Sequence, residues 1–134
     1  MRLIILVSII NGCATAVPVS VDRIRSEMAE IKKNIAENRG NIEKLKDKRI
    51  GTTGYYYIVD TDGIIVFHPQ SALIGSSFKN NRFINKIIDE KTGCLVNQLG
   101  NRIHIVFYDQ LNDSEILCLS ILSDDLRALP ADCR

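Results

Sequence analysis

The stretch GTTGYYYIVDTDGIIVFHP, residues 51–69, contains two apolar runs joined by a four-residue turn. The runs at 55–59 and 64–68 are rich in β-branched and aromatic residues, which favour extended strands. The letters DTDG between them are typical of a turn. We therefore predict an antiparallel hairpin. Pro69 ends the second strand, because proline lacks a backbone N–H and keeps the histidine before it in extended geometry.

Residues 21–49, upstream of the hairpin, have the periodicity of one long helix. The spacing of its apolar positions alternates between three and four residues, which gives one narrow stripe on a charged helix. Two uses of the stripe stay open: packing along a sheet, which we favour for the C-terminal half, or a coiled coil between two copies through the N-terminal half. Residues 38–41, NRGN, are the expected weak point. The stripe positions are Ile24, Met28, Ile31, Ile35, Asn38, Ile42 and Leu45.

The segment after the hairpin predicts one short helix and three more strands. Residues 81–91 carry apolar side chains on one side of a helix that Gly93 ends. Strand-like runs follow at 94–98, 102–109 and 115–122, with turn dipeptides between them. Five short strands with a long helix before them predict an α+β fold, in which the helix covers one face of an antiparallel sheet.

The first residues, MRLIILVSIINGC, have the order of a secretory signal: a basic residue, an apolar run, then small or polar residues. The apolar run is far shorter than the roughly 20 residues that span a bilayer, so we expect its removal. The letters INGC resemble the lipobox of bacterial lipoproteins, although Asn11 departs from the usual small residue. We predict a lipoprotein-type signal peptide at 1–12, lipidation of Cys13 and a lipidated tether at 13–20. An unlipidated secreted protein is the alternative.

Composition and cysteine spacing argue against several functional classes. The 17 basic and 16 acidic residues are interspersed and give a net charge of +1, so we predict no nucleic-acid partner. The sequence has no Cys-x-x-Cys motif or Cys/His cluster for a metal. It also has no recognisable catalytic set, so we predict neither an enzyme nor a cofactor. Cys94 and Cys118 lie in apolar runs and are expected to be buried, whereas their pairing with Cys133 stays open.

A longer pattern runs through the hairpin: Gly-x-x-Gly-Tyr, a strand, Asp-x-x-Gly, a second strand, His-Pro and a later glycine. It resembles the signature of Cache domains, the extracytoplasmic PAS-like sensor modules of bacterial chemoreceptors and histidine kinases. The similarity covers about 21–126, so we assign a Cache-like sensor domain to 21–127 and a tail to 128–134. The resemblance implies a long helix on one sheet face and a small-molecule pocket on the other. The matching positions are Gly51, Gly54, Tyr55, Asp60, Gly63, His68, Pro69 and Gly75.

Strand alternation separates the two faces of the predicted sheet. One face is apolar and suits the long helix. The other combines aromatic rings with arginine, histidine and hydroxyl groups, which can cover an apolar ligand body and hold a carboxylate or polar head group. A solvent-exposed face explains Arg102 and His104 equally well, and for Arg82 we favour a surface position over a role as a second anion anchor. The candidate ligand-binding residues are Tyr55, Tyr57, His68, Arg82, Arg102, His104 and Tyr108.

His68 has two interpretations. Its ring can hydrogen-bond the loop that follows and hold this loop over the pocket, or it can contact the ligand directly. Because the following proline fixes its backbone in extended geometry, we favour the structural role.

These features predict a sensory lipoprotein of the bacterial cell envelope, on its periplasmic or extracellular face. The resemblance implies a small carboxylate, amino acid or amine as ligand. No transmembrane run or signalling module follows the pattern, so we expect a separate membrane receptor, a chemoreceptor or a histidine kinase. The alternative is a non-sensing envelope lipoprotein that uses helix 21–49 as a structural or protein-interaction surface. A homodimer through helix 21–49 is compatible with both.

Overall fold

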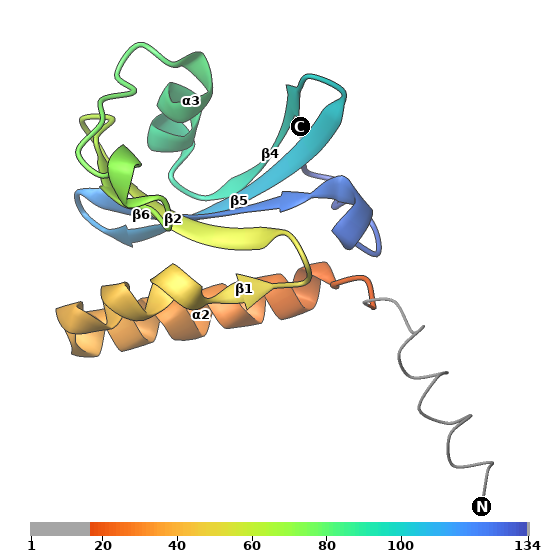
Figure 1. Ribbon diagram of the computed structural model, residues 1–134, viewed down its shortest axis with the longest axis horizontal. Helices are drawn as coiled ribbons and strands as arrows, with labels where there is room; N and C mark the ends of the chain where they lie inside the picture. The colour runs from red at the N-terminus through yellow and green to blue at the C-terminus, as the bar shows by residue number, and fades with distance from the viewer. Residues whose placement is uncertain (1–16, 134) are drawn as a thin grey trace, which may run out of the picture.

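A computed structural model describes residues 17–133. Its antiparallel sheet lies between two unequal helical layers, with the N-terminal helices on one face and a short helix on the other (Figure 1). The strand order is β1-β2-β6-β5-β4, and β3 pairs with β2. The elements are α2 (Val21–Glu37), η1 (Arg39–Asp47), β1 (Arg49–Ile50), β2 (Gly54–Asp60), β3 (Ile65–Phe67), η2 (Ser71–Leu73), α3 (Arg82–Glu90), β4 (Gly93–Leu99), β5 (Arg102–Asn112), β6 (Glu115–Leu122) and η3 (Ser123–Asp125).

The predicted α+β fold is confirmed, with one strand more than expected. β1 and β3 both pair with β2, which also pairs with β6 along residues 55–60. The sheet is therefore five strands wide, and β1 is a two-residue addition that has no apolar pattern of its own. The central strand β6 is buried along its whole length, because sheet neighbours and both helical layers surround it.

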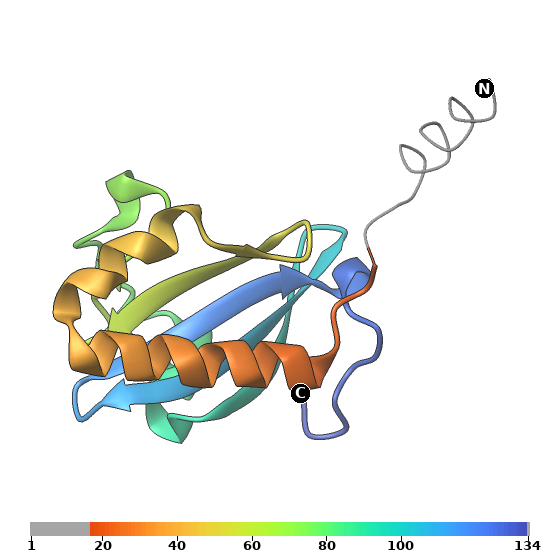
Figure 2. The ribbon, with the colours of Figure 1, turned by 90° about the horizontal axis from the view of Figure 1, so that it is seen from below.

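The predicted helix 21–49 is divided into two helices that lie side by side. α2 ends before Asn38, whose backbone is extended and whose N–H donates to the carbonyl of Asn34. The Asn38 side chain then accepts a hydrogen bond from the Gly40 N–H and caps η1. As Figure 2 shows, η1 runs back along α2, so both helices cover the same sheet face. The expectation of one uninterrupted helix is thus wrong, and the break lies in the predicted weak segment.

The apolar stripe of these helices packs against the sheet. Its aliphatic side chains are all less than 10% exposed, whereas Asn38 is exposed at the helix break. Opposite them lie Tyr56, Ile105, Phe107, Leu117, Leu119 and Ile121, as strand alternation predicted, while Ile103 is 41% exposed. Burial of each aliphatic side chain contributes roughly 1.5–3 kcal/mol. The sheet therefore covers the apolar stripe. None of its aliphatic side chains is left exposed to form the alternative coiled coil between two copies.

Polar contacts also connect the helical layer to the sheet. Arg39 of η1 binds the carboxylate of Glu115 with both terminal nitrogens, and Asn112 donates to the same carboxylate. Because of this pairing, the pKa of Glu115 is lowered and that of Arg39 is raised. The buried Tyr56 hydroxyl donates to Glu27 of α2 at 2.6 Å, and burial raises its pKa. These contacts fix the rotation of the helices on the sheet.

The two ends of the described chain meet at one end of the sheet. The Val19 N–H donates to the carbonyl of Asp125 at 2.7 Å, and the Arg127 N–H donates to the carbonyl of Val19 at 3.0 Å. Val19 is buried, so the fold begins inside the predicted tether 13–20. The predicted signal peptide 1–12 and Cys13 lie outside the described residues and remain predictions. Among residues 17–133, no helix has the length and apolar character to cross a membrane.

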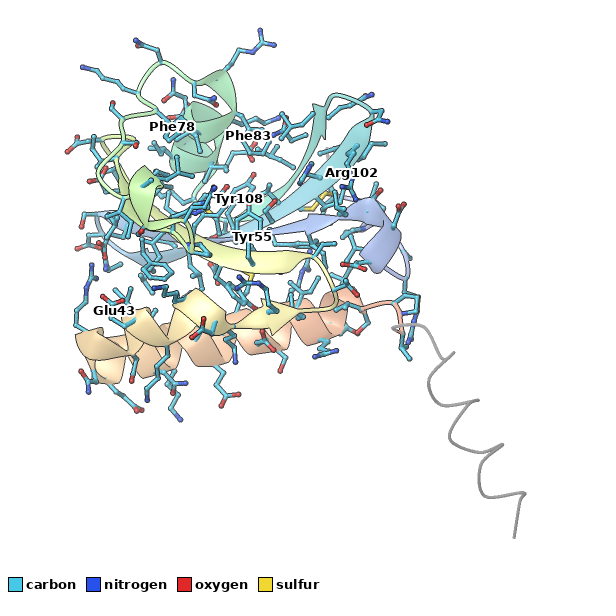
Figure 3. All side chains as sticks on the ribbon, in the orientation of Figure 1. Glu43, Tyr55, Phe78, Phe83, Arg102 and Tyr108 are labelled. Carbon is cyan, nitrogen blue, oxygen red and sulfur yellow. A yellow bond between two sulfur atoms is a disulfide. The ribbon has the colours of Figure 1, made fainter. Side chains whose placement is uncertain are left out.

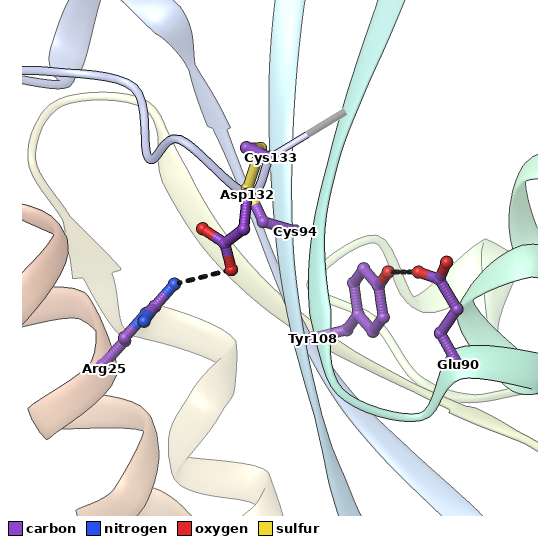
Figure 4. Close-up of a disulfide and its surroundings, with 6 residues drawn as sticks. All are labelled: Arg25, Glu90, Cys94, Tyr108, Asp132 and Cys133. Atoms are coloured by element: carbon purple, nitrogen blue, oxygen red, sulfur yellow. Dashed lines mark hydrogen bonds and ion pairs between the residues drawn. A yellow bond between two sulfur atoms is a disulfide. The ribbon is translucent and has the colours of Figure 1, made fainter.

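A disulfide joins the tail to β4, the edge strand of the sheet. Cys133 is bonded to Cys94 of β4, 39 residues away in the sequence (Figure 4). Cys94 is buried, as predicted, and its pairing, which the sequence left open, is with Cys133 because its strand runs beside the returning tail. Next to the bond, Asp132 pairs with Arg25 of α2 at 3.7 Å. Cys118 is fully buried, as predicted, and it is a free cysteine, whose thiol pKa is raised by burial.

Candidate functional site

The sheet face opposite α2 and η1 carries a cavity of about 320 Å³. Its floor is formed by β2, β4, β5 and β6, and its roof by α3 and the loop before α3. In Figure 3, Tyr55 stands on the same side of the sheet as Phe78 and Phe83. The lining consists of Tyr55, Tyr57, Ile65, His68, Leu73, Phe78, Asn81, Phe83, Ile84, Asn97, Leu99, His104, Val106 and Ser120.

Three rings form one wall of this cavity. The ring centroids of Tyr55 and Tyr57 lie 6.2 Å apart, and that of His68 lies 5.4 Å from the first and 5.7 Å from the second. The two tyrosines point the same way because they are two positions apart on β2. Burial raises the pKa of Tyr57 well above its usual value, so its hydroxyl is neutral and remains a donor. The wall is thus a cluster of mutually tilted rings, with interplanar angles of 34–59°, in which the Tyr57 hydroxyl is neutral at neutral pH.

His68 is positioned by the turn that follows it. Its Nδ1 accepts a hydrogen bond from the Gln70 backbone N–H at 2.9 Å. This nitrogen therefore carries no proton, and the neutral ring is protonated on Nε2. Burial lowers the pKa of the ring, which also favours the neutral form. The ring thus holds the start of the covering loop, as predicted, and it also lines the cavity.

The roof is tied to the hairpin by backbone hydrogen bonds. Ile65 of β3 donates to the Ser76 carbonyl and accepts from the Gly75 N–H, and the Phe78 N–H donates to the Gly63 carbonyl at 2.7 Å. Gly63 has φ +82°, and a Cβ there would lie 3.0 Å from the Lys79 backbone. Only glycine fits this close approach without a shift of the backbone. The glycine of the turn therefore allows the loop to pack over the sheet.

The polar groups of the floor come from facing positions of neighbouring strands. Asn97 of β4 is the register partner of His104 of β5, and Ser120 of β6 is the partner of both Val106 and Tyr55. At the roof, Asn81 caps α3 because its Oδ1 accepts from the Ile84 N–H at 3.0 Å. Its Nδ2 is left as a donor at the cavity. These residues offer both donors and acceptors.

The fold that carries the cavity, an antiparallel sheet covered by helices on one face and by a loop and a short helix on the other, is similar to that of solved chemosensory proteins. A methyl-accepting chemotaxis protein from Vibrio parahaemolyticus is similar with a TM-score of 0.62 and 19% identity, over 75% of this chain and 86% of that one. A Cache chemosensory domain described for carboxylic acid recognition gives 0.56 and 12%, over 76% and 88%. The chain has the Cache fold.

The ligand-binding domain of Mlp24, solved with asparagine, gives a TM-score of 0.53 and 19% identity. The match covers 65% of this chain but spans only 35% of that domain. No protein-family model and no curated protein sequence matches the chain. The similarity is therefore one of fold, and the chemistry of the site has to be argued from its own residues.

The predicted site residues occupy different places in this Cache fold. Tyr55, Tyr57, His68 and His104 line the cavity. Arg82 is exposed at the start of α3, and Arg102 lies at the outer end of β5 in a separate hollow beside η3. The Tyr108 hydroxyl donates to Glu90 of α3 (Figure 4). The cavity lining, as described, includes neither arginine nor Tyr108. The expected anion anchors therefore lie elsewhere on the surface.

Several lining residues were not among the predicted ones. Asn97 shares a face with His104 through their register, and this pairing follows only from the observed strand alignment. Phe78, Asn81 and Phe83 come from the loop and from α3, whose docking has no sequence signal beyond the apolar side of the helix. On β3, a bulge opposite Ile58–Val59 breaks the expected alternation, so that Ile65 lines the cavity and Val66 packs on the other face. The loop before α3, the docking of α3 and the bulge in β3 thus determine which of these residues line the cavity.

Proposed function

We propose that this chain is an extracytoplasmic sensory protein of the Cache type whose cavity binds a small molecule. The observation that carries the proposal is the cavity of about 320 Å³, which is lined by rings and by uncharged donors and acceptors. Its size lies at the lower end of the range for small-molecule sites. The helical layer fills the opposite face, so the cavity is the free concave surface of the sheet. One solved structure of this fold is described for a carboxylic acid and another with asparagine, so both classes belong in a first screen.

We further propose that lipid on Cys13 anchors the protein to the cell envelope and that a separate membrane receptor reads its ligand state. The lipobox-like sequence INGC supports the anchor. A mature protein that begins at Cys13 and carries the mass of a diacylglycerol would support this step. A mature N-terminus elsewhere, without added lipid mass, would contradict it.

Ligand binding is tested by thermal unfolding of the full chain in the presence of small carboxylates, amino acids, amines and uncharged heterocycles. A ligand at about 100 times its dissociation constant stabilises the folded state by roughly 2.7 kcal/mol. The matched control is Ser120→Leu, which fills the floor at a buried position of β6. A ligand response that this variant abolishes supports the proposal. A flat response to every class contradicts it.

The alternative role as a non-sensing interaction module is less well supported. It required the apolar stripe of residues 21–49 as a contact surface, and the aliphatic side chains of that stripe are buried against the sheet. No other observation on the described residues favours it.

A further inference from the structure

The cavity is lined without a formal charge. Among the fourteen lining residues that the structure describes there is no aspartate, glutamate, lysine or arginine. The two histidines are the only side chains there that ordinarily titrate near neutral pH. The Nδ1 atom of His68 accepts a hydrogen bond from the Gln70 N–H, so this nitrogen carries no proton and the ring is neutral. A carboxylate or an ammonium group buried here would lack an opposite charge, which makes its removal from water costly.

Aromatic rings stand on two sides of the cavity. The rings of Tyr55, Tyr57 and His68 form the wall at the sheet, with centroids 5.4–6.2 Å apart. Phe78 and Phe83 come from the roof and face the sheet side on which Tyr55 stands (Figure 3). Aromatic faces and edges favour offset or edge-to-face contact with another ring. The cavity therefore suits a planar ligand better than a branched or extended one.

The edges of the cavity carry amides and an imidazole. Asn97 and His104 lie in register on neighbouring strands, and neither side chain has a hydrogen-bond partner within residues 17–133. Asn81 is left with its Nδ2 donor because its Oδ1 caps α3. A primary amide offers a donor and an acceptor side by side, which matches the –NH–C=O edge of a heterocycle. Both the absence of charged lining residues and the placement of the rings and amides therefore favour an uncharged, planar ligand with amide-like edges.

We propose that this cavity binds an uncharged planar heterocycle with amide-like edges, of the size of one or two fused rings, in preference to a carboxylate, an amino acid or an amine. The inference rests on the proposed function, since it assumes that the cavity is a ligand site. Tyr55, Tyr57, Phe78 and Phe83 contact the ring faces, and Asn97 and His104 recognise the edge. The volume of about 320 Å³ is sufficient for such a ligand and leaves little room for a long substituent.

The test is calorimetric titration of the full chain near neutral pH with uracil, hypoxanthine and nicotinamide, and in parallel with acetate, L-asparagine and putrescine. We expect at least one heterocycle to bind about tenfold or more tightly than every charged probe, because the desolvation cost is much larger for an unpaired charge than for an uncharged amide edge that the site can hydrogen-bond. Heterocycle binding is also expected to change little between about 50 and 500 mM salt, since screening acts on charge pairs. Binding of a charged probe alone would overturn this inference and leave the proposed function intact. Binding of none would overturn both.

Two variants locate the binding. Asn97→Asp puts a negative charge on the floor, and we expect it to weaken heterocycle binding about tenfold or more. Asn85→Asp makes the same change on α3 outside the cavity lining, where it should leave affinity unchanged. If Asn97→Asp lowers the unliganded melting temperature strongly, Phe83→Leu replaces it and should weaken binding by loss of the ring face. Equal affinity in the cavity variant that is used and in Asn85→Asp would overturn the assignment to this site.

Discussion

His68 connects the sheet, the loop and the cavity through one side chain. It follows β3, its Nδ1 accepts the Gln70 N–H, and its ring packs against two tyrosines. The pattern His-Pro allowed the loop-holding role to be predicted, because proline fixes the backbone in extended geometry. Its place at the cavity was predicted too, but the bulge in β3, which puts Ile65 there in place of Val66, has no sequence signal. This strand and its histidine therefore show both what local rules capture and what they omit.

Stability should depend on the protonation of His68. Burial lowers its pKa in the folded state, so the unfolded chain binds the proton more tightly. The stability that the neutral ring contributes is fully present above its unfolded pKa of about 6.5 and is lost as the pH falls through the lower folded value. Urea unfolding below about pH 7 should show a smaller slope of stability against pH for His68→Gln than for the natural chain. His104→Gln keeps His68 and should retain the slope. An unchanged slope in His68→Gln would contradict this assignment.

Arg39 holds the buried carboxylate of Glu115. The side chain of Glu115 is only 10% exposed, whereas that of Arg39 is 54% exposed. Arg39→Met leaves the carboxylate with Asn112 as its remaining side-chain partner, and we expect a loss of about 2 kcal/mol in urea unfolding. The matched control is Arg25→Met, which removes an exposed ion pair with Asp132 and should cost about 0.2–1 kcal/mol. Equal losses in the two variants would show that the Arg39 pair is no more than a surface contact.

At the level of elements, the helices and the long strands were predictable and their short partners were not. The stripe from Ile24 to Leu45 determines which side of the helices is buried, and alternation in β5 and β6 separates the two sheet faces. The break at Asn38 follows from a local alternative, because its side chain caps η1 where a helix would continue. β1 has two residues and pairs only because the turn at Gly51 returns the chain to β2. Such elements depend on tertiary contacts rather than on their own pattern.

The tail should depend on the disulfide for its place on the fold. The bond between Cys94 and Cys133 closes a loop with a sequence separation of 39. In the chain-entropy account, such a loop restricts the unfolded state by roughly 4 kcal/mol. Cys133→Ser should therefore lower the free energy of unfolding by an amount of this order. A reductant should lower the stability of the natural chain to that of the variant and leave the variant unchanged. Reductant sensitivity in Cys133→Ser would contradict the pairing.

In the whole molecule, one face of the sheet forms a hydrophobic core with the N-terminal helices and the other face forms the cavity. The helical layer fills one face with aliphatic side chains and fixes its orientation with partly buried polar pairs. The other face keeps rings and uncharged polar groups around a cavity. β2 belongs to both, since Tyr56 faces the helices while Tyr55 and Tyr57 face the cavity. Alternation along one strand thus lets a single segment serve the core and the site.

β2 also begins where the two chain ends meet. Thr53, two residues before Tyr55, donates its backbone N–H to the carboxylate of Asp125 at 2.7 Å. Its hydroxyl also donates to this carboxylate and accepts the Leu122 N–H at 3.0 Å. The Asp125 carbonyl in turn accepts the Val19 N–H. The start of the fold, its last strand and the strand under the cavity therefore share one hydrogen-bond network.

Removal of the Asp125 carboxylate should loosen the chain ends without unfolding the sheet. We expect Asp125→Ala to raise hydrogen exchange at the amides of Val19 and Arg127 about tenfold, which corresponds to a local loss of about 1.4 kcal/mol. Amides of the central strand β6, such as those of Leu117 and Leu119, should keep their protection because their ladder partners are unchanged. Asp124→Ala is the matched control, since Asp124 is exposed and its side chain has no hydrogen-bond partner among the described residues. If exchange rises equally along β6, the network is part of the global core. If hydrogen exchange rises neither at Val19 and Arg127 nor along β6, the backbone hydrogen bonds of Val19 with residues 125 and 127 hold the chain ends without the Asp125 carboxylate.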